Sequence, residues 1–272
     1  MPQLLSRKSP ADKRGQTQEI TPESAGWEYV GFEVFHLPAG ASMQDSCGGR
    51  EVCLVVVAGT VTVRSGDQEW AEIGERQSPF ESLAPYALYL PPGRHYTVVS
   101  SADAELAVCS APAEGRYPAR LIKPEDCERE VRGTGTNQRH ICNILFGNME
   151  AERLLVVEVI TPNGNWSSYP PHKHDTDAVP QETHLEETYY HRLNPPQGFA
   201  FQRVYTDDRS LDETMSVEDG DVVMVPRGYH PVGAPHGYDL YYLNVMAGPR
   251  RQWIFHNDPE HAWMLEQAQS RA

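Results

Sequence analysis

A repeated segment is the feature that most limits how this chain of 272 residues can fold. The run Leu90–His95 (LPPGRH) matches Val225–His230 (VPRGYH), which lies 135 residues further along the chain. Each copy follows a short apolar run and ends it with proline and glycine, which terminate strands in turns. A duplicated pattern of short strands and turns predicts an all-β chain with two antiparallel β-barrels of the jelly-roll type. A pair of β-sandwiches is the alternative.

Strand-like runs, rich in β-branched and aromatic residues, fill both halves of the chain. We expect an N-terminal arm over residues 1–25, which has little apolar sequence to pack. A first barrel domain is predicted over 26–113, a connection with one strand at 140–145 over 114–150, and a second barrel domain over 151–272. Helices are expected to be few and short, one of them closing the chain at 258–267 because Pro259 suits a first helical turn.

Charge and cysteine usage narrow the class of protein. The net charge of −15 argues against a basic surface for nucleic acid. The five cysteines are odd in number and lack a C-x-x-C pair, which favours free thiols in a reducing compartment. Without an apolar run of signal-peptide or membrane-spanning length, we expect a cytoplasmic protein with no membrane partner.

The segment PPHKHD at 170–175 carries the strongest chemical signal. In an extended chain, His172 and His174 point to the same side, so both imidazoles can reach one ion. Glu187 begins a strand beyond a polar loop, and His230 follows the second repeated turn. Three histidines and one carboxylate around an open position predict a catalytic site for a divalent metal such as Zn, Mn or Fe. Two solvated histidines and a buried structural histidine are the alternative.

The identity of the carboxylate is open from spacing alone. The loop between His174 and Glu187 is long, so Glu182 and Glu186 are alternatives to Glu187. Glu187 is favoured because the predicted strand starts there. By strand alternation, Tyr189 and His191 then face the same side as Glu187.

These motifs resemble those of the cupin superfamily. The first cupin motif corresponds to Gly164, His172, His174, Glu187 and Gly198, and the second to Gly220, Pro226, Gly228 and His230. The chain departs from the usual pattern in its long loop before Glu187 and in the single residue between Gly228 and His230. The first half keeps Glu51 and His95 but has Ser46–Gly49 (SCGG) in place of the histidine pair. The resemblance therefore implies a bicupin in which only the second half binds metal.

Longer blocks carry a more specific resemblance. SSYPPHKHD, LEETYYHR, QRVYTDD, DVVMVPRGYHP, YDLYYLNVMAGP and DPEHAW are similar to the 5-deoxy-glucuronate isomerase family of inositol catabolism, which is related to 5-keto-4-deoxyuronate isomerase. The resemblance covers nearly the whole chain. It implies a metal-dependent aldose–ketose isomerisation of 5-deoxy-D-glucuronate to 5-dehydro-2-deoxy-D-gluconate, with metal ligands His172, His174, Glu187 and His230.

Such a reaction needs a group that moves a proton and a partner for the substrate carboxylate. The candidate catalytic residues near the motif are Tyr189, Glu182 and His191. The candidate substrate-binding residues are Arg203, Arg227 and Lys173 as cations, with Tyr229 and Tyr242 as hydroxyl donors.

Other functions compete with this interpretation. They are another uronate or sugar-acid isomerase, a cupin dioxygenase, and a sugar-binding or storage cupin without catalysis. For the isomerase, the expected partner is a small-molecule sugar-acid substrate, and we expect a homo-oligomer, dimeric or larger.

Overall fold

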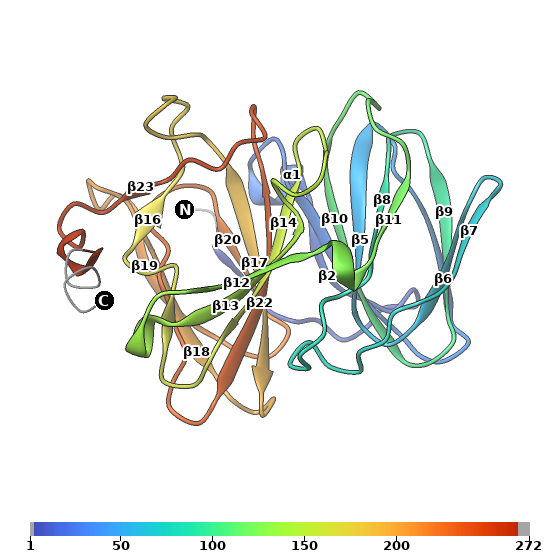
Figure 1. Cartoon of the computed structure of the whole chain (residues 1–272), viewed down its shortest axis with the longest axis horizontal. Helices are drawn as coiled ribbons and strands as arrows, with labels where there is room; N and C mark the ends of the chain where they lie inside the picture. The colour runs from blue at the N-terminus through green and yellow to red at the C-terminus, as the bar shows by residue number, and fades with distance from the viewer. Residues whose placement is uncertain (1–2, 266–272) are drawn as a thin grey trace.

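The chain folds almost entirely into antiparallel strands, as described for residues 3–265 by a computed structural model. The strands form two halves, each with one large and one smaller sheet, seen on the right and left of Figure 1. The prediction of an all-β fold with two barrel-like halves is thereby confirmed. Short helices join some strands, namely α1 (Pro22–Ala25), η1 (Pro124–Asp126) and η2 (Gly135–Asn137). The range 258–267, over which a closing helix was expected, includes residues 266 and 267, which lie outside the described residues.

The N-terminal half contains a six-stranded and a four-stranded sheet. The larger sheet has the spatial order β11 (Arg120–Ile122), β8 (Ala87–Leu90), β5 (Arg50–Ala58), β10 (Ala104–Pro112), β3 (Gly31–Leu37) and β2 (Gln16–Ile20). The smaller sheet has the order β4 (Ser42–Ser46), β9 (His95–Ser100), β6 (Val61–Ser65) and β7 (Gln68–Ile73).

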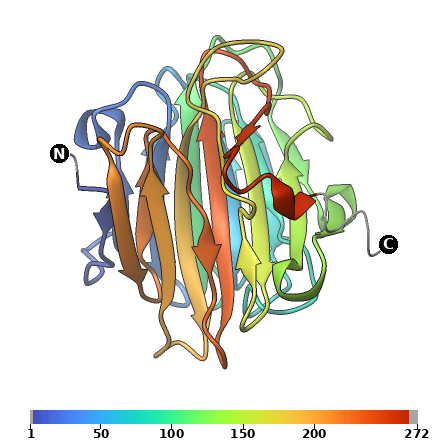
Figure 2. The ribbon, with the colours of Figure 1, turned by 90° about the vertical axis from the view of Figure 1, so that its left-hand side faces the viewer.

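The C-terminal half has a seven-stranded sheet, a four-stranded sheet and a two-stranded ribbon. The largest sheet has the order β1 (Leu5–Ser6), β20 (Val222–Val225), β17 (Glu186–Asn194), β22 (Asp239–Ala247), β14 (Leu155–Thr161), β13 (Arg139–Leu145) and β12 (Glu128–Arg132). The four-stranded sheet has the order β15 (Trp166–Ser167), β21 (Val232–Gly233), β18 (Ala200–Tyr205) and β19 (Asp212–Val217). The ribbon joins β16 (His172–Lys173) to β23 (His256–Asn257). Figure 2 turns this half toward the viewer and shows its strands side by side.

The two large sheets pack against each other and form a core between the halves. Residues of β3, β5 and β10 share this core with residues of β14, β17 and β22. For example, the rings of Phe32 and Tyr190 meet across it with their centroids 5.8 Å apart. Because β5 is covered on both faces, its sequence is a nearly unbroken apolar run rather than an alternating one. Separate apolar cores fill the interior of each barrel.

Two buried glutamates connect the halves reciprocally. Glu51, at the start of β5, accepts hydrogen bonds from the backbone N–H groups of residues 152–154, which lead into β14. Glu186, at the start of β17 and 135 residues later, accepts them from the N–H groups of residues 28–30, which lead into β3. A carboxylate with three N–H donors is well stabilised although it is buried. The repeat seen in the sequence is therefore also a repeat of the contacts between the halves.

The predicted arm and connection are more structured than expected. Instead of lying loose, residues 1–25 supply β1, which pairs with β20, and β2, which pairs with β3. The predicted strand at 140–145 is present as β13, but β12 beside it was missed. Both strands belong to the large sheet of the C-terminal half. Sequence pattern missed β1 and β12 because both lie at sheet edges, where polar residues and short strands are common.

Within residues 3–265, no helix has the length and apolar character needed to cross a membrane.

Candidate active site

Three histidines from separate parts of the C-terminal half meet at one end of its barrel. His172 lies on β16, His174 follows two residues later, and His230 follows the turn after β20. One ring nitrogen from each histidine can be chosen so that all three lie within 4.8 Å of one another. His174 and His230 are buried, whereas His172 is partly exposed. The predicted i, i+2 geometry therefore brings both imidazoles of the His-x-His segment to the same point as His230.

Backbone carbonyls orient two of these rings. Nδ1 of His174 lies 3.2 Å from the carbonyl oxygen of Leu185, and Nδ1 of His230 lies 2.8 Å from that of Gly228. A carbonyl oxygen beside Nδ1 accepts a hydrogen bond from the ring proton and keeps that proton on Nδ1. The lone pair then lies on Nε2, the nitrogen that can bind a metal. Nε2 of His230 is buried and has no hydrogen-bond partner among the described residues. His230 thus presents an unshared nitrogen lone pair within the cluster.

Steric constraints explain why residue 228, in the repeated turn, is glycine. Gly228 has a φ of +91°, and a Cβ there would lie 2.4 Å from the carbonyl oxygen of Tyr205. Only glycine accommodates both the left-handed backbone and this close approach. The turn places His230 in the cluster, so the Pro-x-Gly-x-His spacing is a requirement of the site.

Glu187 is the carboxylate that faces the histidines. Its Oε2 atom lies 3.2 Å from Nε2 of His174 and 3.2 Å from Nε2 of His230. Glu186 projects from the opposite face of β17 toward the N-terminal half. Glu182 accepts hydrogen bonds from the Lys173 ammonium and from backbone N–H groups of its own loop. Both alternative glutamates are therefore engaged elsewhere.

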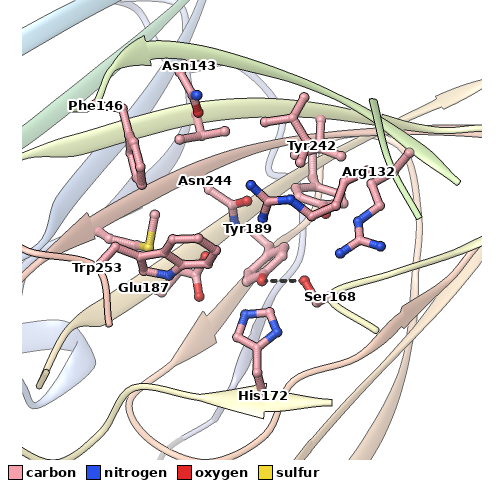
Figure 3. A pocket seen from close by; sticks show the side chains of 15 residues that line it. Arg132, Asn143, Phe146, Ser168, His172, Glu187, Tyr189, Tyr242, Asn244 and Trp253 are labelled. Carbon is pink, nitrogen blue, oxygen red and sulfur yellow. Dashed lines mark hydrogen bonds between the residues drawn. The ribbon is translucent and has the colours of Figure 1, made fainter. Parts of the chain in front are cut away.

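A groove opens beside the cluster. Its polar lining residues are Arg132, Arg139, Asn143, Ser168, His172, Glu187, Tyr189, Tyr242 and Asn244, and its apolar lining includes Phe146, Met246 and Trp253. Figure 3 shows Tyr189 and Ser168 directly above His172, joined by a hydrogen bond. The distance between their hydroxyl oxygens is 3.0 Å. The groove therefore combines hydroxyl, amide and cationic groups with aromatic walls.

Burial sets the protonation states of these groups. Burial, aided by repulsion from His230 and His174, holds the pKa of His172 well below its usual value. Burial likewise lowers the pKa of His230. Burial also acts to lower the pKa of His174, but the hydrogen bond and charge of Glu187 outweigh it and raise that pKa. Burial raises the pKa of Tyr189 far above its usual value, so the phenol keeps its proton at neutral pH.

Several residues predicted from sequence lie outside the groove lining. Lys173 forms ion pairs with Asp175 and Glu182. Arg203 is half-exposed and pairs with Asp212 on the neighbouring strand. These cations already have acidic partners, so the structure does not support their assignment to the substrate carboxylate.

Three further predicted residues have structural partners elsewhere. The hydroxyl of Tyr229 donates to Asp207. Arg227 is exposed and donates to the hydroxyl of Ser210. His191 faces the barrel interior as predicted, but it stacks behind Tyr189 and hydrogen-bonds Gln202 at 2.9 Å. Of the predicted catalytic and substrate-binding residues, only Tyr189 and Tyr242 line the groove.

Sequence reasoning missed five polar groove residues, namely Arg132, Arg139, Asn143, Ser168 and Asn244. The two arginines lie on the β12–β13 hairpin, in the segment taken for a connection. Asn244 had a usable signal, because it is a polar residue in the middle of the apolar run YDLYYLNVMA. A polar side chain in a buried strand needs a partner, and a site is one reason for its presence.

Fold and site together define a bicupin with a buried histidine cluster in its C-terminal half. The fold likeness extends to Bacillus subtilis oxalate decarboxylase, which superposes with a TM-score of 0.67 at 13% identity, covering 100% of this chain and 85% of that one. At this identity the likeness concerns the fold alone. The chain belongs to the KduI/IolB family, whose model matches residues 4–264.

Near relatives span almost the whole chain. The 5-deoxy-glucuronate isomerase of Geobacillus kaustophilus is 53% identical over 266 residues, 98% of this chain and 96% of its own length. That of Bacillus subtilis strain 168 is 51% identical over 249 residues, covering 91% of this chain and 92% of its own length. The crystal structure of an IolB-like protein from Salmonella typhimurium superposes with a TM-score of 0.93 at 54% identity, covering 97% of this chain and 99% of that one.

Proposed function

We propose that this chain is a metal-dependent aldose–ketose isomerase that converts 5-deoxy-D-glucuronate to 5-dehydro-2-deoxy-D-gluconate in myo-inositol catabolism. Relatives named 5-deoxy-glucuronate isomerase support the substrate and the reaction. The observation in the structure that carries the proposal is the buried cluster of His172, His174 and His230 beside a groove lined by hydroxyl and guanidinium groups.

The donor set fits a divalent cation. Three imidazole nitrogens converge, two of them from rings oriented by backbone carbonyls, and Glu187 adds a carboxylate beside them. Nitrogen ligands with one carboxylate suit Zn, Mn or Fe. We assign His172, His174, His230 and Glu187 as the ligands. When bound, such an ion supplies a Lewis acid, which makes the proton beside a sugar aldehyde easier to remove.

Tyr189 is the residue best placed to hold and return a proton. Its hydroxyl lies in the groove, and burial keeps the phenol protonated at neutral pH. It can therefore donate its proton to an oxygen of the sugar as negative charge develops there. The Ser168 hydroxyl, 3.0 Å away, fixes the orientation of the phenol.

The remaining groove residues bind and orient the sugar. Tyr242 and Asn244 offer a hydroxyl and an amide to the hydroxyl groups of the substrate. Trp253 packs on Phe146 with ring centroids 5.8 Å apart and forms an apolar wall. This wall limits the access of water to the reacting carbon atoms.

The test is turnover of 5-deoxy-D-glucuronate by the purified chain, followed by NMR. The protein is stripped with a chelator and then reloaded separately with Zn²⁺, Mn²⁺ or Fe²⁺ under anaerobic conditions. We expect the ketose product only after reloading. A stripped enzyme that stays fully active would contradict the metal assignment. Conversion of a different uronate but not of this one would favour another sugar-acid isomerase, and dependence on oxygen would favour a dioxygenase.

A further inference from the structure

Arg139 is a buried cation inside the candidate site. It begins β13, lines the groove beside His172 and Tyr242, and is 9% exposed. A guanidinium so far from water is costly unless its charge is compensated. The compensating group should therefore be visible in the fold or be supplied by a ligand.

The fold supplies only neutral partners to this side chain. Nη1 of Arg139 donates to the carbonyl oxygen of Asn137, to the Asn137 side-chain oxygen and weakly to the carbonyl oxygen of Tyr169. No ion pair to Arg139 is found within residues 3–265, and its Nε and Nη2 atoms have no acceptor there. Arg76, the other buried arginine of the described chain, instead directs both Nη atoms to the Glu158 carboxylate at 2.9 and 2.7 Å. Arg139 thus keeps one edge of its guanidinium free.

The surroundings favour an anion at this free edge. Arg132 lines the same wall of the groove, and its guanidinium lies 5.5 Å from the ring centroid of Trp253. Glu187 is the one carboxylate among the described groove residues, and it faces the histidines. Arg132 is itself paired with Glu130. Arg139 therefore carries the unpaired positive charge of this wall among the described residues, in a chain whose net charge is −15.

We propose that Arg139 binds the carboxylate of the sugar acid through the free edge of its guanidinium. A planar guanidinium matches a carboxylate with two parallel hydrogen bonds, and the buried setting strengthens them. Anchoring one end of the substrate leaves its aldehyde end for the histidine cluster. Arg139 is then the residue that makes the enzyme specific for uronic acids over neutral sugars. This inference rests on the proposed function.

The experiment compares two substrates in matched variants. 5-Deoxy-D-glucuronate is paired with 5-deoxy-D-glucose, which carries a hydroxymethyl group in place of the carboxylate. We expect the wild type to prefer the acid by about 100-fold or more in kcat/KM. Arg139→Gln should lower kcat/KM for the acid by about 100-fold and change that for the neutral sugar by less than about threefold. Arg139→Lys should retain an intermediate preference, because the charge remains but the paired geometry is lost.

Arg203→Gln is the matched control, since Arg203 is a half-exposed arginine paired with Asp212 outside the groove. It should behave like the wild type with both sugars. Metal content and the unfolding curve of each variant show whether the site is intact. An Arg139→Gln enzyme that still prefers the acid as strongly as the wild type would overturn the inference. A wild-type enzyme that converts both sugars equally well would also overturn the inference. This comparison does not depend on whether the variants fold. A wild type that converts neither sugar would instead contradict the proposed function.

Discussion

The inner faces of the two barrels occupy equivalent positions but carry opposite chemistry. The inward side chains of β5 are Val52, Leu54 and Val56, and those 135 residues later on β17 are Glu187, Tyr189 and His191. The central strands follow the same order in both barrels, although a bulge between Glu105 and Leu106 shifts the β5–β10 register by one residue and β17–β22 has none. Leu54 pairs with Leu88 and Val108, whereas Tyr189 pairs with Val223 and Asn244.

This comparison teaches that the backbone is not what distinguishes the barrel with the histidine cluster from the other. The shared strand order provides a similar scaffold twice, and the side chains fill it differently. An apolar interior stabilises the first barrel through burial of nonpolar surface. Polar groups in the second interior are costly to bury unless they have partners, which is typical of a functional site. The first half and the core between the large sheets therefore stabilise the fold that holds the second interior in place.

The largest expected effect comes from removing a histidine of the cluster. His230→Ala should abolish bound divalent metal and lower isomerase turnover by at least about 1000-fold, because one of three converging nitrogens is lost. His172→Ala should do the same. The protein should remain folded, since the apolar cores are untouched. Metal analysis, turnover and a thermal melt measure the three properties.

His95→Ala is the control for this comparison. His95 occupies the place of His230 in the repeated turn of the N-terminal half, but its side chain is exposed. Its loss should leave metal content and turnover unchanged. A metal-free double variant of His172 and His230 with full activity would show that the cluster has no catalytic role.

Removing one hydroxyl from the second interior should have the next largest effect. Tyr189→Phe should reduce kcat by about 100-fold or more, because the buried phenol can no longer give a proton to the substrate. Bound metal should be retained. Tyr89→Phe is the matched change in the N-terminal half, where the hydroxyl donates to Glu51 at 2.8 Å. It should cost about 1 kcal/mol of stability without affecting kcat. Equal losses of kcat in both variants would argue against a proton-transfer role for Tyr189.

Much of this comparison could be predicted from sequence, because the informative residues are local. Strand alternation placed Tyr189 and His191 on one face, and the His-x-His spacing brought His172 and His174 together. The repeated turn located His230. These inferences need only the period of a strand and the chemistry of imidazole.

The missed features depend on long-range pairing instead. Arg139 reaches the groove because β13 pairs with β14, and nothing in the polar sequence around it indicates that contact. Lys173 and Arg203 were predicted to meet the substrate because they are cations near the motif. Their acidic partners, Glu182 and Asp212, become visible only when the loop and the β18–β19 hairpin are folded. Sequence proximity to a motif is thus a weak guide to which charges remain free.

Glu51 and Glu186 make equivalent contacts between the two halves, so their replacement tests whether both contacts stabilise the fold equally. Glu51→Gln and Glu186→Gln should each lower the free energy of unfolding by about 2–4 kcal/mol, because each carboxylate accepts three backbone hydrogen bonds and an amide NH₂ group would face some of those donors. Urea denaturation measures both. Glu186→Gln should keep its metal, unlike Glu187→Gln. A folded Glu186→Gln protein that loses its metal would instead mean that Glu186 supports the histidine cluster.

The smallest effect is expected at Glu33, a charged residue in the otherwise apolar N-terminal barrel. Glu33 on β3 pairs with Val108, and Val157 on β14 pairs with Asn244 in the equivalent place. Burial, together with the charges of Asp45 and Glu19, raises the pKa of Glu33 to about 7. A folded-state pKa above the unfolded value means that ionisation costs stability as pH rises from about 4.5 toward 7. Glu33→Gln should therefore stabilise the protein by about 1 kcal/mol at pH 8, after allowing for solvent screening, and by much less at pH 5. The measurement is the free energy of unfolding in urea at both pH values, with the exposed Glu128→Gln as control. An equal gain at both pH values would show that the stabilisation does not come from the charge of Glu33.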